Sequence, residues 1–235
     1  LQQLINSELI YRAGNGYVFK HALVQDAAYE SLLKSRRQHL HSDIAQALPR
    51  LMPTVAETEP ELLARHYTSA GRIEEALPHW LSAGQLAFAR ARNAEAIRHF
   101  DNGLALLDQQ SERSDSDGLA FSLNAGLAFA CIAEGGYGDP RVAEALAAAE
   151  KAAEGMAETP ALVGARCMFG VYHWARGDLV AAGKYLDGRA DKAPPSADTL
   201  LQVAKDWSGG VYQLHAGRLA FGKQILDRAM SVYDS

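Results

Sequence analysis

The sequence feature that most constrains the fold is an internal repeat of forty residues. The segment GVYHWARGDLVAAGKYLD, from Gly170, aligns with GVYQLHAGRLAFGKQILD, from Gly210, and seven of the eighteen aligned positions are identical. Self-similarity at a period of roughly 20–50 residues is typical of arrays in which each unit buries its apolar face against its neighbours. The repeat therefore predicts stacked units in the C-terminal part of the chain.

Each copy has the pattern of a helical hairpin. A glycine at the start of the copy lets two helices approach closely, and a second glycine seven residues later ends the first helix. A small residue followed four positions later by a large one predicts a hole and a knob on the second helix. The same small-to-large spacing occurs earlier in the chain, as Ala76 with Trp80 and Ala96 with Phe100.

The first fifty residues show a different pattern. We predict a short helix over Leu1–Ile10, then a β-hairpin in YRAGNGYVFKH that turns at Asn15-Gly16. A helix should follow and end near residues 48–52, at Pro49 and Pro53, and TVAETEPE should form a polar connector. The apolar stripe of this helix is expected to contain Leu33, Leu40, Ile44, Leu48 and Leu51. Helix, hairpin and helix is the order in which a winged-helix fold ends.

From Glu59 onward the pattern is helical throughout. Helices are expected in PELLARHYTSAG, ending at Gly71, and in the two segments that follow, with Asn93 as an N-cap. Residues 109–118 should form a polar loop, and GYGDP a turn with Pro140 at the start of the next helix. We predict an all-α protein with one short β-hairpin and two domains, residues 1–52 and residues 59–235.

Residues 59–235 resemble the tetratricopeptide repeat family in the longer form, of about forty residues, found in bacterial signalling regulators. The resemblance rests on the repeat above and on the spacing of Tyr67, Gly71, Ala76, Trp80 and Ala83. It implies a right-handed α-solenoid with a concave surface that binds other molecules.

Three segments between residues 19 and 87 resemble the region after the ATPase core of bacterial STAND ATPase regulators, which carry a winged helix and then helical repeats. The resemblance rests on FKHALVQDAAYESLL, RRQHLHSDIAQAL and PELLARHYTSAGRIEEALPHWLSAGQLA. In that family the histidine of the Phe-x-His motif can face the phosphates of the nucleotide, which implies a nucleotide-sensing role for His21. From the residues alone, a histidine at a strand-to-helix junction is usually a surface or capping residue.

The resemblance also implies a larger parent protein. Its members often carry a class III adenylate or guanylate cyclase domain, or a DNA-binding domain. This chain contains no G-x-x-x-x-G-K-[ST] loop, so ATP, ADP and Mg²⁺ are expected in the parent and no cofactor is expected here. The chain begins at Leu1, inside an amphipathic pattern, and we interpret it as a piece of a longer protein.

The composition of the chain limits the classes of partner that it can bind. The formal net charge is −5, which provides no basic field for nucleic acid, and no apolar run approaches the roughly 20 residues that span a bilayer. Cys131 and Cys167 are predicted to be buried, reduced thiols in a cytoplasmic protein. The histidines show no metal-ligand spacing. A basic run is either a solvated helix face or a surface for an acidic partner; it contains Lys34, Arg36, Arg37, His39 and His41.

We interpret the chain as a non-catalytic interaction and regulatory module. Its repeats are expected to bind a protein or small effector, or the ATPase domain of the parent, and an open apolar end near RAMSVYDS is expected to favour self-association. The residues predicted to line the binding groove are Arg65, His66, Arg166, His173, Lys205 and Gln213.

Two alternatives remain at the level of sequence. One is a small all-α enzyme, which would need a convergent polar pocket. The other is a DNA-binding winged helix, although its recognition helix, Leu1–Ile10, carries no Lys or Arg.

Overall fold

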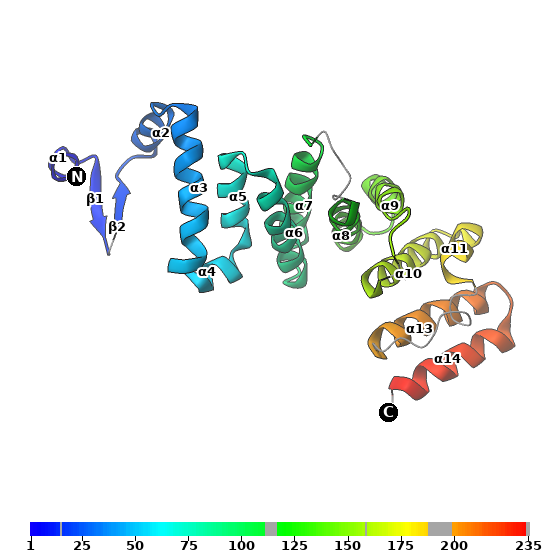
Figure 1. Cartoon of the computed structure of the whole chain (residues 1–235). Coiled ribbons are helices and arrows are strands. Elements are labelled where there is room, and N and C mark those ends of the chain that lie inside the picture. Colours follow the sequence, from blue (N-terminus) through cyan, green and yellow to red (C-terminus); the bar gives the residue numbers. More distant parts are fainter. Residues whose placement is uncertain (15, 111–116, 158, 188–198, 234–235) are drawn as a thin grey trace. The chain divides into compact units, whose positions relative to one another are not determined.

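The computed structural model describes residues 1–14, 16–110, 117–157, 159–187 and 199–233. These residues form thirteen helices and one two-stranded antiparallel sheet, so the chain is all-α apart from a single hairpin (Figure 1). The prediction of an all-α fold with one β-hairpin is confirmed.

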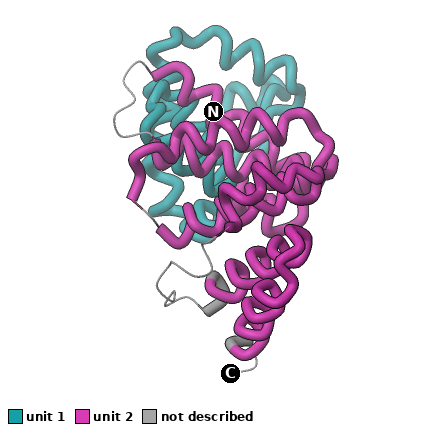
Figure 2. Tube along the Cα trace, turned by 90° about the vertical axis from the view of Figure 1, so that its right-hand side faces the viewer, with its two compact units in different colours: residues 1–83 teal, residues 84–235 magenta. Residues whose placement is uncertain are grey.

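The chain packs into two compact units, Leu1–Ala83 and Gly84–Ser235 (Figure 2). The boundary falls inside helix α6 (Ile73–Ala89), which contributes residues to both units. The division into domains at residues 52–59 stays a prediction.

The first unit begins with a short helix and the β-hairpin. In the hairpin Ile10 pairs with Phe19 and Ala13 with Gly16, and Ile10 is buried. Helices α3 and α5 then pack against each other. The elements of this unit before α6 are α1 (Gln2–Asn6), β1 (Ile10–Ala13), β2 (Gly16–Phe19), α2 (Ala22–Glu30), α3 (Lys34–Leu51), α4 (Pro53–Thr58) and α5 (Pro60–Ala70).

Several predictions for this unit are corrected. The first helix ends at Asn6, because Glu8 adopts a left-handed conformation (φ 58°) that breaks it before the strand. The connector is helical in part, since Pro53 and Pro60 occupy first-turn positions of α4 and α5, where a missing N–H costs nothing. The expected stripe is largely solvent-facing: Leu33 and Leu51 are each 77% exposed, and Leu33 precedes α3.

The second unit continues with pairs of antiparallel helices. Helices α7, α8 and α9 pack in sequence, and α10 contacts both α11 and α13. Its remaining elements are α7 (Asn93–Leu107), α8 (Asp117–Gly135), α9 (Pro140–Ala152), α10 (Pro160–Ala175), α11 (Leu179–Leu186), α13 (Thr199–His215) and α14 (Leu219–Tyr233).

The turns of this unit agree with the sequence in most places. The GYGDP turn is present, with Asp139 as the N-cap of α9 and Pro140 as its first residue. Asn93, in contrast, is the first residue of α7 and not its cap, which is Arg92. Part of the predicted polar loop, residues 111–116, lies outside the described residues.

Four hairpin turns close in the same way: α5–α6, α6–α7, α10–α11 and α13–α14. In each, a residue one or two positions after the end of the first helix has a positive φ, and the next residue donates its N–H to the carbonyl five positions earlier at 2.9 Å. This is the Schellman closure that glycine favours. The left-handed residues are Gly71, Ala91, Gly177 and Gly217, and the donors are Arg72, Arg92, Asp178 and Arg218.

A glycine on the first helix of three of these hairpins receives a large side chain from sixteen residues later. A methyl group on Gly84 would lie 2.4 Å from Phe100 Cε1, and one on Gly170 would lie 2.4 Å from Leu186 Cγ. The third pair, Gly210 and Leu226, has a corresponding distance of 2.7 Å. Each glycine therefore provides the space in which the second helix packs.

The α5–α6 hairpin has the same spacing with alanine in place of glycine. Ala64 is fully buried, and Trp80, sixteen residues later, is 4% exposed and donates its indole N–H to Thr68 Oγ1 at 3.0 Å. The hairpin geometry that the forty-residue repeat predicts for α10–α11 and α13–α14 therefore also occurs in the α5–α6 and α6–α7 hairpins.

Candidate functional site

His21 lies at the junction between β2 and α2, as the sequence predicts. It is the N-cap residue of α2, its backbone is extended, and its side chain makes no capping hydrogen bond. The side chain is exposed, as are those of Gln25 and Asp26. A nucleotide-sensing role for His21 stays a prediction.

His66 belongs to a chain of polar contacts that joins three helices of the first unit. Tyr29 Oη on α2 lies 2.9 Å from His41 Nε2 on α3, and His41 Nδ1 lies 2.8 Å from His66 Nδ1 on α5. Only one of the two facing nitrogens can carry the shared proton. Burial lowers the pKa of both histidines, and the neighbouring His41 lowers the pKa of His66 further. Arg65, the adjacent groove candidate, is exposed.

Part of the basic run on α3 is used within the first unit. Arg37 Nη1 donates to the carbonyls of Tyr29 and Glu30, both at 3.4 Å, and its guanidinium lies 5.2 Å from the Tyr29 ring centroid. His39 forms an ion pair with Asp43 at 3.8 Å. Arg37 thus supplies positive charge to the carboxyl end of α2.

Arg166 and His173, both on α10, lie around the side chain of Tyr185 on α11. The rings of His173 and Tyr185 stack almost in parallel, with centroids 5.8 Å apart, and Tyr172 meets His173 edge-on at 5.2 Å. The Tyr185 hydroxyl donates a hydrogen bond to Glu150 on α9. Burial and Glu150 raise the pKa of Tyr185, against a smaller opposing effect of Arg166.

Lys205 and Gln213 lie in the interior of the second unit. Lys205 is 7% exposed and Gln213 1% exposed. Gln213 Nε2 donates to Asp187 Oδ1 at 3.2 Å, and its Oε1 has no hydrogen-bond partner in the described structure. Contact of the six groove candidates with a partner stays a prediction, and two of them, Lys205 and Gln213, are buried within the second unit.

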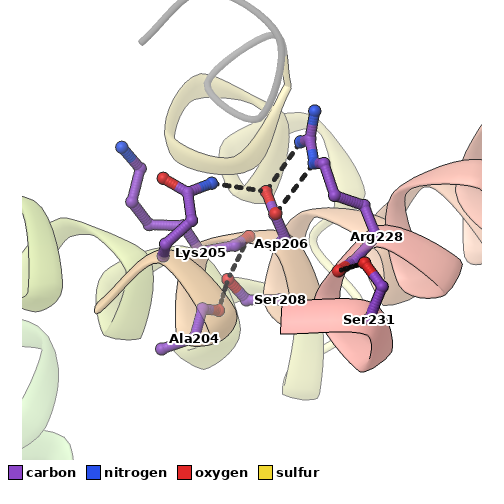
Figure 3. A network of polar contacts seen from close by, with 7 residues as sticks. Ala204, Lys205, Asp206, Ser208, Arg228 and Ser231 are labelled. Atoms are coloured by element: carbon purple, nitrogen blue, oxygen red, sulfur yellow. Dashed lines mark hydrogen bonds and ion pairs between the residues drawn. The ribbon is translucent and has the colours of Figure 1, made fainter. Parts of the chain in front are cut away.

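Next to Lys205, the fully buried Asp206 forms an ion pair that ties α13 to α14 (Figure 3). Arg228 donates from Nε to Oδ2 at 2.9 Å and from Nη2 to Oδ1 at 2.7 Å. Gln202 Nε2 adds a third hydrogen bond to the carboxylate at 3.0 Å. A planar guanidinium held by two parallel bonds is strong and directional, so this pair fixes one helix against the other.

An exposed apolar surface lies on α10 and α13, the first helices of the two repeated hairpins. Trp207 is 56% exposed and Met168 is 39% exposed. The two helices meet where Trp174 contacts His215 edge-on, with ring centroids 5.0 Å apart. We call this surface the first-helix face; it contains the exposed Met168, Ala204 and Trp207 and the half-buried Val171, Trp174 and Val211.

Sequence reasoning missed the first-helix face because it selected polar residues as groove candidates. The signal was present: on α13, residues 204, 207 and 211 recur at helical spacing and are apolar. Exposed apolar side chains gathered on one surface are typical of protein interaction sites.

A hollow of about 460 Å³ lies between α9 and the end of α10. We call it the α9–α10 hollow. One wall is a single face of α9, with Glu150 at its end, and the other wall ends at Asp178, the N-cap of α11. It is lined by Ala143, Leu146, Ala147, Glu150, Tyr172, His173, Arg176 and Asp178.

Both cysteines lie in the interior of the second unit. Cys131 and Cys167 are both buried thiols, as the sequence predicts, and burial raises the pKa of the Cys131 thiol. The thiolate is the reactive form of cysteine, so a raised pKa disfavours its formation at Cys131. Within the described ranges, no group of three or more His, Cys, Asp or Glu side chains is placed to hold a metal ion.

Helix α8 corrects the expectation about apolar length. It has nineteen residues, and its most apolar window has a mean hydropathy of 1.3, enough to cross a membrane by length and composition alone. Helices buried in protein cores pass the same test. In this structure α8 packs between α7 and α9 and buries Phe121, Leu123 and Leu127 among others.

Comparisons with known proteins give little beyond the fold. No protein-family model matches the chain. It is 32% identical over 103 residues to the uncharacterized protein R02095 of Rhizobium meliloti (strain 1021), an alignment that covers 44% of this chain and 10% of that protein. The chain thus matches about a tenth of the length of this relative.

Among solved structures, the chain is similar to BtubC (BKLC) from P. vanneervenii. The TM-score is 0.57 at 14% sequence identity, and the match covers 87% of this chain and 92% of the other. At this identity the similarity concerns the fold alone.

Proposed function

We propose that the chain is a non-catalytic interaction module that binds a protein partner through the first-helix face. The supporting observation is the exposure of apolar side chains, Trp207 above all, on consecutive first helices of two equivalent hairpins. Burial of an exposed tryptophan is a large source of binding free energy, and tryptophan is enriched among the residues that dominate interfaces.

We further propose that the hairpins form a tetratricopeptide-like, right-handed solenoid. The equal closure of four turns and the sixteen-residue pairing of a small with a large residue support this assignment. The module would belong to a cytoplasmic signalling ATPase of the STAND type, in which the winged-helix end carries the nucleotide state to the repeats. The match to a small part of a much longer relative is compatible with that placement.

Site-specific crosslinking in the native host tests the interaction function. A photoreactive phenylalanine analogue replaces Trp207 in one strain and Lys223, an exposed residue of α14, in a control strain. The proposal expects a discrete adduct from position 207 that is absent from position 223. The same adducts from both positions, or none from position 207, would overturn it.

A second experiment tests the non-catalytic assignment. The purified chain is incubated with ATP and, separately, with ester and phosphoester substrates. We expect no turnover above background, and turnover that survives repeated purification would favour the small-enzyme alternative. The coding sequence upstream of Leu1 tests the ATPase parentage, which requires a phosphate-binding loop there.

A further inference from the structure

The polar groups that line the α9–α10 hollow are held in place by hydrogen bonds within the chain. Glu150 is fixed by the hydroxyl of Tyr185, and Asp178 Oδ1 accepts the backbone N–H of Ala181 at 2.9 Å. Arg176 Nη1 donates to the carbonyl of Tyr137 at 2.9 Å. Exposed charged side chains are ordinarily mobile, so this order removes part of the entropic cost of binding.

Acidic groups outnumber basic ones among the charged side chains that line the hollow, since Glu150 and Asp178 face the single guanidinium of Arg176. An ionised carboxylate accepts about four hydrogen bonds, whereas Glu150 and Asp178 each accept one from the described side chains and caps. Arg176 already has a carbonyl acceptor and lies over the Tyr172 ring, 5.7 Å from its centroid. The two carboxylates therefore keep acceptor capacity that Arg176 does not use, and a cationic donor complements their charge.

Most of the other residues that line the hollow are apolar or aromatic. Leu146 and Tyr172 are buried at 5% and 4% exposure, and Ala143 and Ala147 line the same side. Such a surface suits an alkyl stem that ends in a charged group. The volume lies within the range of roughly 300–1,000 Å³ that ligand sites occupy.

We propose that the α9–α10 hollow receives an arginine or lysine side chain of a partner polypeptide, with Glu150 and Asp178 as acceptors. The proposal rests on the proposed interaction function, but it concerns a different surface from the first-helix face. The net charge of −5 favours the approach of a basic partner.

Fluorescence anisotropy with the full chain tests the proposal. The probe is a labelled peptide with three arginines spaced by Gly-Ser, and its control is the same peptide with citrulline, which keeps the shape and lacks the charge. We expect the arginine peptide to bind at least about tenfold more tightly. Equal binding of the two peptides would overturn the proposal.

Two variants locate the binding. Glu150→Gln keeps an acceptor for Tyr185, and Asp178→Asn keeps a residue suited to cap α11, so each removes charge with little change in structure. Each variant should lower the affinity for the arginine peptide by about three- to tenfold and leave the affinity for the citrulline peptide unchanged. Glu144→Gln, an exposed change on α9 outside the hollow, should have no effect. Equal weakening by Glu144→Gln and Glu150→Gln would mean non-specific attraction and would overturn the site.

Competition by small cations distinguishes a polypeptide ligand from a free cation. Spermidine and arginine amide should compete with the peptide only weakly, because they lack flanking backbone. If spermidine occupies the hollow in a Glu150-dependent way and the peptide does not bind, the polypeptide assignment is wrong. If the arginine peptide does not bind but the crosslink at position 207 is still observed, the site in the hollow is rejected and the proposed interaction function stands.

Discussion

At the scale of single residues, the glycines on the first helices decide whether a hairpin can close. Gly84 has no space for a side chain, since three ring atoms of Phe100 lie 2.4–2.7 Å from the position of an added methyl group. Phe100 itself is 1% exposed and cannot move toward solvent without opening the core.

We expect Gly84→Ala to destabilise the chain by about 1–3 kcal/mol, the range typical of an overpacked core. Gly118→Ala is the matched control, because Gly118 lies in α8 and a methyl group there meets nothing within 4 Å. The control should be neutral or more stable by up to about 1 kcal/mol, from helix propensity alone. Urea unfolding followed by circular dichroism measures both, and equal effects would contradict the packing argument.

The facing nitrogens of His41 and His66 make the first unit sensitive to acid. Burial lowers the pKa of both residues in the folded chain below the ordinary histidine value, so the unfolded chain binds protons more readily. Their contribution to stability is therefore present above the unfolded pKa, near 6.5, and is lost as the pH falls through the lower folded values.

We expect the melting temperature of the chain to fall on acidification from about pH 7.5 to pH 5, and the double variant His41→Gln, His66→Gln to show a smaller fall. Differential scanning fluorimetry at constant ionic strength measures the slope of melting temperature against pH. A variant with the slope of the parent would show that other groups cause the acid sensitivity.

At the scale of elements, the sequence predicts the positions of the helices well, but it predicts the burial of their side chains and the contacts between helices less well. The periodicity and the glycine turns predict the repeated hairpins, because these depend on residues close together in the chain. Ala91 shows the limit: it closes the α6–α7 turn at φ 55° without the glycine that marks the other three turns.

The candidate site was harder to predict than the helices. The α9–α10 hollow depends on how two consecutive helices are placed relative to each other, and no local sequence pattern contains that information. Lys205 and Gln213 illustrate the same problem, since their polarity suggested a surface position and their neighbours bury them.

The ion pair between Asp206 and Arg228 allows a test of how α13 and α14 are joined. Arg228→Ala leaves the fully buried carboxylate without its charged partner, whereas Asp206→Ala leaves a guanidinium side chain that is 42% exposed. We expect Arg228→Ala to cost about 2–4 kcal/mol and Asp206→Ala less, with a double variant less costly than the sum.

The exposed ion pair between Lys223 and Asp227 on α14 is the control for this double-mutant comparison. Its side chains are 75% and 59% exposed, so removing it should change the free energy of unfolding by less than about 1 kcal/mol. Chemical denaturation of the four variants gives the coupling energy, and a coupling near zero for Asp206 and Arg228 would contradict the structural role of the pair.

At the scale of the whole molecule, stability is unevenly distributed. Of the described residues among the first 52, two are buried, Ile10 and Ala45, whereas α8 alone buries seven. Segments with few buried apolar contacts open at low free-energy cost. The N-terminal segment is therefore the part of the chain whose order most depends on what it contacts.

Hydrogen exchange followed by mass spectrometry tests this distribution. Amides in residues 1–52 should exchange within seconds to minutes, and amides in α7, α8 and α9 should remain protected far longer. Uniform protection along the chain would show that it unfolds as a single cooperative body.

The closure of a hairpin depends on residues at fixed distances within that hairpin, seven and sixteen positions after its small residue. Inserting a single amino acid inside this window would place the wrong side chain opposite the glycine, whereas duplicating a complete hairpin would leave every distance intact. Natural variants of this chain should therefore differ in length by entire hairpins, or by changes confined to the segments that join them.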